Sequence, residues 1–112
     1  MSIAGDLIRG HTDAIILARL MRGDSYGYEI NKAVTRLSDG KLELKEATLY
    51  TAFRRLEEGG YVASYWGGEQ SGARRRYYTI TASGREACFR LLEEWGQTKQ
   101  IMDKLLEMEE SQ

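Results

Sequence analysis

The apolar positions between residues 44 and 80 predict a helix followed by a two-stranded hairpin. From about Glu46 to Glu58, apolar residues recur at spacings of three and four, as they do on one side of an α-helix. These positions are Leu49, Ala52, Phe53 and Leu56. Gly59 and Gly60 follow, and glycine readily takes the left-handed conformation that ends helices. The β-type segments YVASYW and RRRYYTIT then flank the loop GGEQSGA. A helix followed by a basic hairpin indicates a winged helix.

The opposite side of this predicted helix is suited to a DNA groove. It has no carboxylate before Glu58, whereas a helix that faces only water usually alternates acids and bases. Arg54 is the best candidate for a base contact, because a guanidinium group matches the two acceptors of guanine. A phosphate contact, or an ion pair with Glu57 or Glu58, is the alternative. The residues on this side are Ala47, Tyr50, Thr51 and Arg54, with Thr48 and Arg55 at its margin.

Other residues near this helix are further candidates for contact with the DNA backbone. Lys45 and Thr48 lie near the helix N-terminus, where backbone N–H groups favour anions. The Tyr50 hydroxyl could bind a phosphate, or its ring could pack against the preceding helix. Tyr26, at the start of that preceding helix, could touch the backbone or belong to the core.

Three consecutive arginines begin the second strand of the predicted hairpin. Strand alternation places Arg74 and Arg76 on one face and Arg75 on the other, so the three cannot act alike. The glycine-rich loop suits an arm that settles on a minor groove or its phosphates. A solvated basic strand is the alternative.

Two shorter helices are predicted before this region. The first spans about Thr12 to Arg22, with Thr12 or Asp13 as its cap and Gly23 after it. The second carries apolar residues at helical spacing, begins after Asp24 or Ser25 as its cap, and ends near residues 38–40. The segment 41–44 alternates polar and apolar residues and could pair as a short strand. The apolar positions of the second helix are Tyr26, Ile30, Ala33, Val34 and Leu37.

The end of the chain predicts one long helix of about 28 residues, with Thr81 as its cap. Its apolar positions follow steps of three and four, which is the pattern of a coiled-coil seam. The seam consists of Cys88, Leu91, Trp95, Thr98, Met102 and Leu105. Because a small winged-helix core cannot cover so much apolar surface, we expect a second copy to do so in a two-fold dimer. Folding back on its own domain is the alternative.

Length, composition and charge exclude several classes of protein. A chain of 112 residues with 42% hydrophobic and 29% charged residues is typical of one globular domain. The net charge is −1, and it divides into +2 for residues 41–80 and −3 for residues 81–112. A single cysteine and a single histidine exclude an internal disulfide and make a zinc site improbable, so no metal or cofactor is expected. The expected location is the reducing cytoplasm, at the nucleoid, with no membrane span.

No arrangement of catalytic residues is present, so an enzyme is not expected. His11 has no evident partner in the sequence, and Cys88 falls on the apolar seam, where packing is its expected role. After its last glycine the loop GGEQSG continues with Ala73 and Arg74, where a phosphate-binding loop has its lysine and hydroxyl residue. A winged-helix module that binds another protein and no DNA is the competing class of function.

The motifs GDSYGYEI, LKEATLYTAFRRLEEGGYV, SYWG and GARRRYYTITASGRE together resemble the PadR family of bacterial transcriptional regulators. The resemblance covers roughly residues 8–106 and is nearest to the short subfamily of multidrug-binding repressors. It implies an α+β, mainly helical fold, with a winged helix-turn-helix DNA-binding domain (1–80) and a C-terminal dimerisation helix (81–112). It also implies that the protein binds double-stranded operator DNA and represses transcription. Many family members have proline at the position of Thr51, so base preference does not carry over to this chain.

Trp95 is the principal candidate for binding a small molecule. It lies in the middle of the seam, so two-fold symmetry would place it near its own copy, and two indoles can sandwich a flat aromatic molecule. Interface packing without a ligand is the alternative. The subfamily resemblance implies a pore for planar aromatic drugs at this place. The other residues assigned to that site are Ala14, Ile15, Phe89, Lys99 and Met102.

Overall fold

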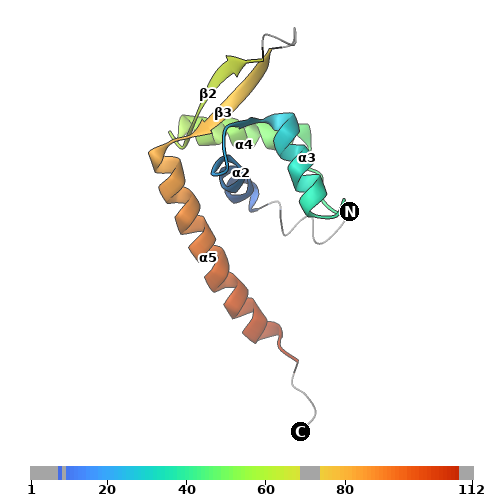
Figure 1. Ribbon diagram of the computed structural model, residues 1–112. Coiled ribbons are helices and arrows are strands. Elements are labelled where there is room, and N and C mark those ends of the chain that lie inside the picture. Colours follow the sequence, from blue (N-terminus) through green and yellow to red (C-terminus); the bar gives the residue numbers. More distant parts are fainter. Residues whose placement is uncertain (1–7, 9, 69–73, 109–112) are drawn as a thin grey trace.

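The computed structural model describes residues 8, 10–68 and 74–108. Helices α2, α3 and α4 form a compact body, and the β2–β3 hairpin and α5 project from it in opposite directions (Figure 1). This arrangement confirms the predicted mainly helical α+β fold with a winged helix. The elements are α2 (Thr12–Leu20), β1 (Ser25–Tyr26), α3 (Gly27–Leu37), α4 (Glu46–Glu58), β2 (Val62–Gly67), β3 (Arg75–Ile80) and α5 (Ala82–Leu106).

The sheet is antiparallel, with the strand order β1-β3-β2. In β2 and β3, Ser64 lies opposite Tyr78, and Val62 lies opposite Ile80. Side chains of directly opposed residues share a face of the sheet. Val62, Tyr78 and Ile80 are buried, so their face is the inner face, and it covers the helices.

The core lies where the apolar sides of the helices meet this inner face. Phe53 of α4 is the largest fully buried side chain, and its ring stacks on Tyr78 with 3.9 Å between centroids. Burying a side chain of this size stabilises the fold by about 1.5–3 kcal/mol. The predicted apolar side of α4 is buried in full, at Leu49, Ala52, Phe53 and Leu56. This burial fixes the helix with its opposite side outward.

The start of α2 differs from the prediction. The helix begins with His11 in the N-cap position and without a side-chain cap, so neither Thr12 nor Asp13 caps it. Thr12 is buried, and Asp13 instead binds Arg55 of α4. The prediction was wrong because Asp13 has a partner on another helix. The helix also ends at Leu20, slightly earlier than predicted.

The start of α3 differs for a similar reason. Tyr26 occupies its N-cap position and Gly27 is its first residue, so neither Asp24 nor Ser25 is the cap. Ser25 and Tyr26 instead form β1, which pairs with β3. The Ser25 hydroxyl donates to the Glu29 carboxylate at 2.5 Å. The sequence pattern did not reveal this strand because its partner lies about fifty residues away.

The segment 41–44 is not a strand, contrary to the prediction. The Asn31 side-chain amide donates to the Leu44 carbonyl at 2.7 Å and accepts from the Leu44 N–H at 3.0 Å. The Ser38 hydroxyl accepts from the Leu42 N–H at 2.9 Å. These side chains satisfy backbone groups that a neighbouring strand would otherwise satisfy.

The first turn of α5 is joined to the end of α4. As predicted, the Thr81 hydroxyl caps α5 by accepting from the Gly84 N–H at 3.0 Å, and it donates to the Gly60 carbonyl at 2.7 Å. Gly60, with φ of 82°, supplies the left-handed turn after α4. A Cβ atom at Gly84 would lie 2.1 Å from the Tyr61 carbonyl oxygen. Glycine is therefore needed for α5 to approach this closely.

The rest of α5 extends beyond the body. The helix has 25 residues, close to the predicted 28, and its buried residues are Gly84, Ala87 and Cys88. Further along the seam, Trp95, Met102 and Leu105 are 46%, 44% and 72% exposed. Within the described part of the chain, α5 thus does not fold back to bury this surface, and it projects alone (Figure 1).

Candidate nucleic-acid interface

The outward side of α4 is the centre of the candidate interface. Ala47, Tyr50, Thr51 and Arg54 are exposed there, as the sequence predicts. Among the described residues, none forms an ion pair or hydrogen bond with Arg54. Its guanidinium group therefore keeps its donors for an external acceptor. The predicted alternative of an ion pair with Glu57 or Glu58 is not seen.

Arg55, by contrast, is bound within the protein. Its Nε atom donates to Asp13 Oδ2 at 3.2 Å, and its Nη2 atom donates to Asp13 Oδ1. This two-point contact raises the pKa of the Arg55 guanidinium, chiefly through the hydrogen bond. The pair ties α4 to α2, so Arg55 has a structural role in addition to the predicted DNA contact.

Tyr50 packs against the start of α3. A Cβ atom at Gly27 would lie 3.0 Å from the Tyr50 hydroxyl oxygen, so the phenol ring rests on a glycine surface. The side chain is still 44% exposed. The predicted packing role is thus present, and the hydroxyl lies at the junction between α3 and α4.

The N-terminal part of α4 has polar residues at its edge. Lys45 is its N-cap residue in extended conformation, without a side-chain cap, and is exposed. Thr48 is half-buried and Thr51 is exposed. Thr51 therefore lies on the outward side of α4 with Arg54, whereas Lys45 is exposed at the start of the helix.

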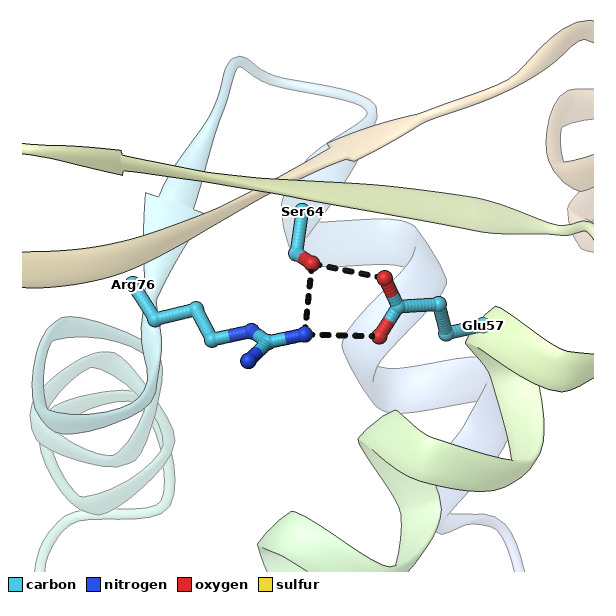
Figure 2. Close-up of polar contacts among 3 residues, drawn as sticks. All are labelled: Glu57, Ser64 and Arg76. Atoms are coloured by element: carbon cyan, nitrogen blue, oxygen red, sulfur yellow. Dashed lines mark hydrogen bonds and ion pairs between the residues drawn. The ribbon is translucent and has the colours of Figure 1, made fainter.

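The wing, defined here as β2 and β3, is bound to α4 by a polar network on its inner face. The Ser64 hydroxyl donates to Glu57 at 2.6 Å and accepts from Arg76 at 2.9 Å. Arg76 also pairs with Glu57 at 3.3 Å. Figure 2 shows these three side chains converging between the hairpin and the end of α4. The network fixes the angle between the wing and α4, and Arg76 is the predicted DNA residue that it holds.

The three arginines divide between the two faces of the wing, as alternation predicts. The guanidinium carbons of Arg74 and Arg76 lie 5.0 and 5.8 Å from the centroid of the Trp66 ring. That of Arg75 lies 5.0 Å from the Tyr26 ring, on the outer face. Tyr26 belongs to β1 and not to a helix. Of the predicted tip GGEQSGA, which spans residues 67–73, residues 69–73 lie outside the described residues.

The outer face of the wing is fastened to the turn before β1. The Tyr65 hydroxyl donates to Asp24 at 2.6 Å, and the Tyr65 ring stacks on Tyr77 with 5.6 Å between centroids. Hydrogen bonds from Tyr65 and then Thr79 lower the pKa of the Asp24 carboxyl group. This contact was not predicted, because the two residues lie far apart in the chain.

The residues predicted to bind a small molecule lie on α2 and α5. Trp95 is partly exposed, and the His11 ring meets its edge at 5.1 Å between centroids, with 68° between the planes. His11 thus has a partner that the sequence analysis did not find. His11 lies just before Ala14 and Ile15, two predicted members of the same site, and this position in the sequence could have indicated the contact. Of the other predicted residues, those on α2 are half-buried and those on α5 exposed: Ala14 and Ile15, and Phe89, Lys99 and Met102.

Cys88 has the packing role that the sequence predicts. It is buried in the core, and this burial raises the pKa of its thiol. Within the described residues, no cluster of histidine, cysteine and carboxylate side chains could hold a metal ion. No described helix is both long and apolar enough to cross a membrane.

The α3–α4 pair and the attached wing together form a winged helix-turn-helix, a fold that presents one helix to a DNA groove. Residues 16–90 match the model of the transcriptional regulator PadR-like family, and the chain belongs to this family. It is therefore a DNA-binding regulator of transcription and not an enzyme.

Similar proteins support the same assignment. A transcriptional regulator from Clostridium thermocellum is 47% identical, with a TM-score of 0.83 over 91% of this chain and 99% of that chain. A PadR family regulator from Clostridium difficile is 36% identical, with a TM-score of 0.73 over 86% and 98%. An uncharacterized protein from Lysinibacillus sphaericus is 39% identical over 105 residues, which is 94% of this chain and 96% of that protein.

Proposed function

We propose that the protein is a homodimeric repressor that leaves its operator when a planar apolar or aromatic molecule binds between the two copies of α5. Residues 1–80 bind the DNA in this proposal, and residues 81–112 hold the dimer together. The main supporting observation is the exposed apolar seam of α5. Trp95, Met102 and Leu105 follow one another on one side of the helix and remain exposed in the single chain.

A dimer would bury the seam and would present two copies of α4 to one duplex. Burying apolar side chains against a second copy removes them from water, at about 25 cal/mol for each Å² of apolar surface. Two-fold symmetry then presents two copies of α4, and such helices reach successive major grooves when they lie about 34 Å apart. Arg54 is the base-contacting residue in this arrangement, and Lys45, Thr48, Tyr50 and Thr51 surround it.

The wing and its neighbours supply backbone contacts in the same proposal. Arg74 and Arg76 serve phosphates near α4. Tyr26, Arg55 and Arg75 contribute less than the sequence suggested, because Arg55 is bound to Asp13 and Arg75 lies against Tyr26.

The two copies of Trp95 form the site for the small molecule. A flat aromatic molecule gains stacking and apolar burial between two indoles, without directional bonds. The nearby lining is Ala14, Ile15, Phe89, Lys99 and Met102. The molecule releases DNA if it binds more tightly to a dimer whose α4 helices have the wrong separation, because it then shifts the population toward that state.

A gel-shift assay tests the complete proposal. The duplex upstream of the protein's own gene should shift at low salt, and a planar aromatic dye should reverse the shift. A random duplex of equal length is the control for operator preference. A shift that the dye leaves unchanged at saturating concentration would rule out the proposed release.

The role of Trp95 is tested separately. Trp95→Ala should abolish the fluorescence response of a planar dye, while sedimentation still shows a dimer. Trp66→Ala is the matched control, because it removes the other tryptophan, which lies in the wing. Dissociation of the Trp95→Ala dimer would instead assign this residue to assembly.

A further inference from the structure

The inner face of the wing carries an exposed indole with two guanidinium groups close to it. Trp66 is 53% exposed, although it belongs to a regular strand. Arg74 and Arg76 lie 5.0 and 5.8 Å from its ring centroid. A large apolar ring with two cations beside it is suited to a partner that is apolar in part and anionic in part. The deoxyribose-phosphate backbone has both properties.

Trp66 lies on the same side of the wing as α4. Alternation along β2 places Val62, Ser64 and Trp66 on one face. Val62 of that face is buried in the core, and Ser64 binds Glu57 of α4. Trp66 is the fifth residue of β2, toward the end of the strand that is far from Val62, and the β2–β3 hairpin extends beyond the body (Figure 1). A duplex placed along the outward side of α4 therefore meets the Trp66 face of the wing.

The other face of the wing is occupied by contacts within the protein. Tyr65 stacks on Tyr77 and donates to Asp24. Arg75 lies over Tyr26. These contacts leave this face fewer groups for DNA than the Trp66 face offers.

The position of the indole is fixed before any DNA is bound. Trp66 is directly opposite Arg76 in the β2–β3 register. Arg76 is in turn held by Ser64 and Glu57 (Figure 2). A ring that is already oriented loses less conformational entropy on binding.

We infer that Trp66 is a further DNA-contact residue, whose ring packs against deoxyribose in the groove next to α4 while Arg74 meets an adjacent phosphate. The indole N–H can only donate a hydrogen bond, and the phosphate oxygens of DNA can only accept one, so the two groups are complementary. Contacts to sugar and phosphate position a protein without reading the base sequence. This inference rests on the DNA-binding mode proposed above and does not depend on the small molecule.

Fluorescence tests the position of Trp66 directly. The chain has two tryptophans, so Trp95→Phe leaves Trp66 as the only one. Addition of the upstream duplex should change its emission and lower its quenching by acrylamide at least about twofold, because bound DNA covers the ring. Unchanged quenching in a sample whose gel-shift shows binding would overturn the inference and leave operator binding intact. A duplex that the parent protein does not shift at all would refute both.

Affinity measurements test the kind of contact. Trp66→Ala should weaken binding to operator and random duplexes alike, by roughly tenfold, and Trp66→Phe should restore most of the loss. Tyr65→Phe is the matched control on the opposite face and should change neither affinity by more than about twofold. Thermal melting by circular dichroism shows whether each variant is folded. Loss of operator binding alone, with random binding unchanged, would overturn the assignment to sugar and phosphate.

Discussion

Helices α4 and α5 both carry a regular apolar stripe, but only one of these stripes is covered. In α4 the stripe is Leu49, Ala52, Phe53 and Leu56, and each of these residues is at most 3% exposed. In α5 coverage ends near Cys88, and Leu105 near its far end is 72% exposed. The same periodicity therefore serves two purposes.

The difference shows that helical periodicity alone does not indicate which partner buries a stripe. The α4 stripe is covered by the sheet and the other helices within the domain. The α5 stripe continues after the domain has ended (Figure 1). Substitutions on the two helices should consequently affect different properties: folding and DNA binding for α4, and assembly for the far part of α5.

The largest effect is expected at the joint where α5 is still covered. Gly84→Ala places a Cβ atom 2.1 Å from the Tyr61 carbonyl oxygen, which should lower the free energy of unfolding by about 3 kcal/mol. The control is Gly96→Ala in the same helix, where a Cβ atom meets nothing within 4 Å. It should gain about 0.5–1 kcal/mol from helix propensity. Thermal or urea unfolding at one fixed protein concentration measures both, and equal losses would contradict the comparison.

Assembly should respond to a charge at the uncovered end of the seam. Leu105→Lys should weaken the dimer by about 2 kcal/mol, because a charge would have to be buried against the partner. Gln100→Lys adds the same charge on the opposite side of α5, where the side chain is exposed, and should leave the dimer intact. Sedimentation across a range of concentrations measures the dissociation constant. An unchanged constant for Leu105→Lys would place the interface elsewhere.

The outward side of α4 should determine operator preference. Arg54→Ala should weaken operator binding by about 1–2 kcal/mol and relax the preference at one base pair. Arg55→Ala is the control, since Arg55 is bound to Asp13 and should alter stability more than base preference. Binding to operators with single base changes separates the two roles. An equal loss on every sequence would make Arg54 a phosphate contact.

The smallest effect concerns the tie between the wing and the turn before β1. Tyr65 and Thr79 hold the pKa of Asp24 below its ordinary value of 3.8. A carboxyl group whose pKa is lower in the folded protein than in the unfolded chain stabilises the fold at pH values above its unfolded-state pKa. This contribution is lost as the pH falls through its folded-state pKa. Asp24→Asn should therefore be slightly less stable than the parent at about pH 6, and this difference should be smaller at about pH 3. A difference that is the same at both pH values would exclude this origin.

Local pattern predicted most of the fold. The apolar side of α4, the Thr81 cap and both hairpin strands follow from spacing and turn residues, so the sequence located them to within a few residues. The errors concern Ser25 and Tyr26, which pair with a strand far along the chain, and the segment 41–44, whose backbone is bound by Asn31 and Ser38. Such distant partners leave no local periodicity.

The candidate site was predictable only in part. The exposure of Arg54 follows from helical periodicity, whereas the capture of Arg55 by Asp13 depends on how α2 packs against α4. Trp66 could have been placed on the inner face from its alternation with Val62 and Ser64. The contact between His11 and Trp95 depends on the angle at which α5 leaves the body, and no spacing rule gives that angle.

The hydrogen bond from Thr81 to Gly60 and the close fit of Gly84 make α5 a rigid lever attached to the end of α4. A helix of 25 residues is about 37 Å long. A tilt of about 5° between two such levers moves their far ends by about 3 Å. In the proposed dimer, a flat molecule bound between the two α5 helices would thus change the separation of the two α4 helices, so that they no longer match the duplex. Neither domain would have to deform.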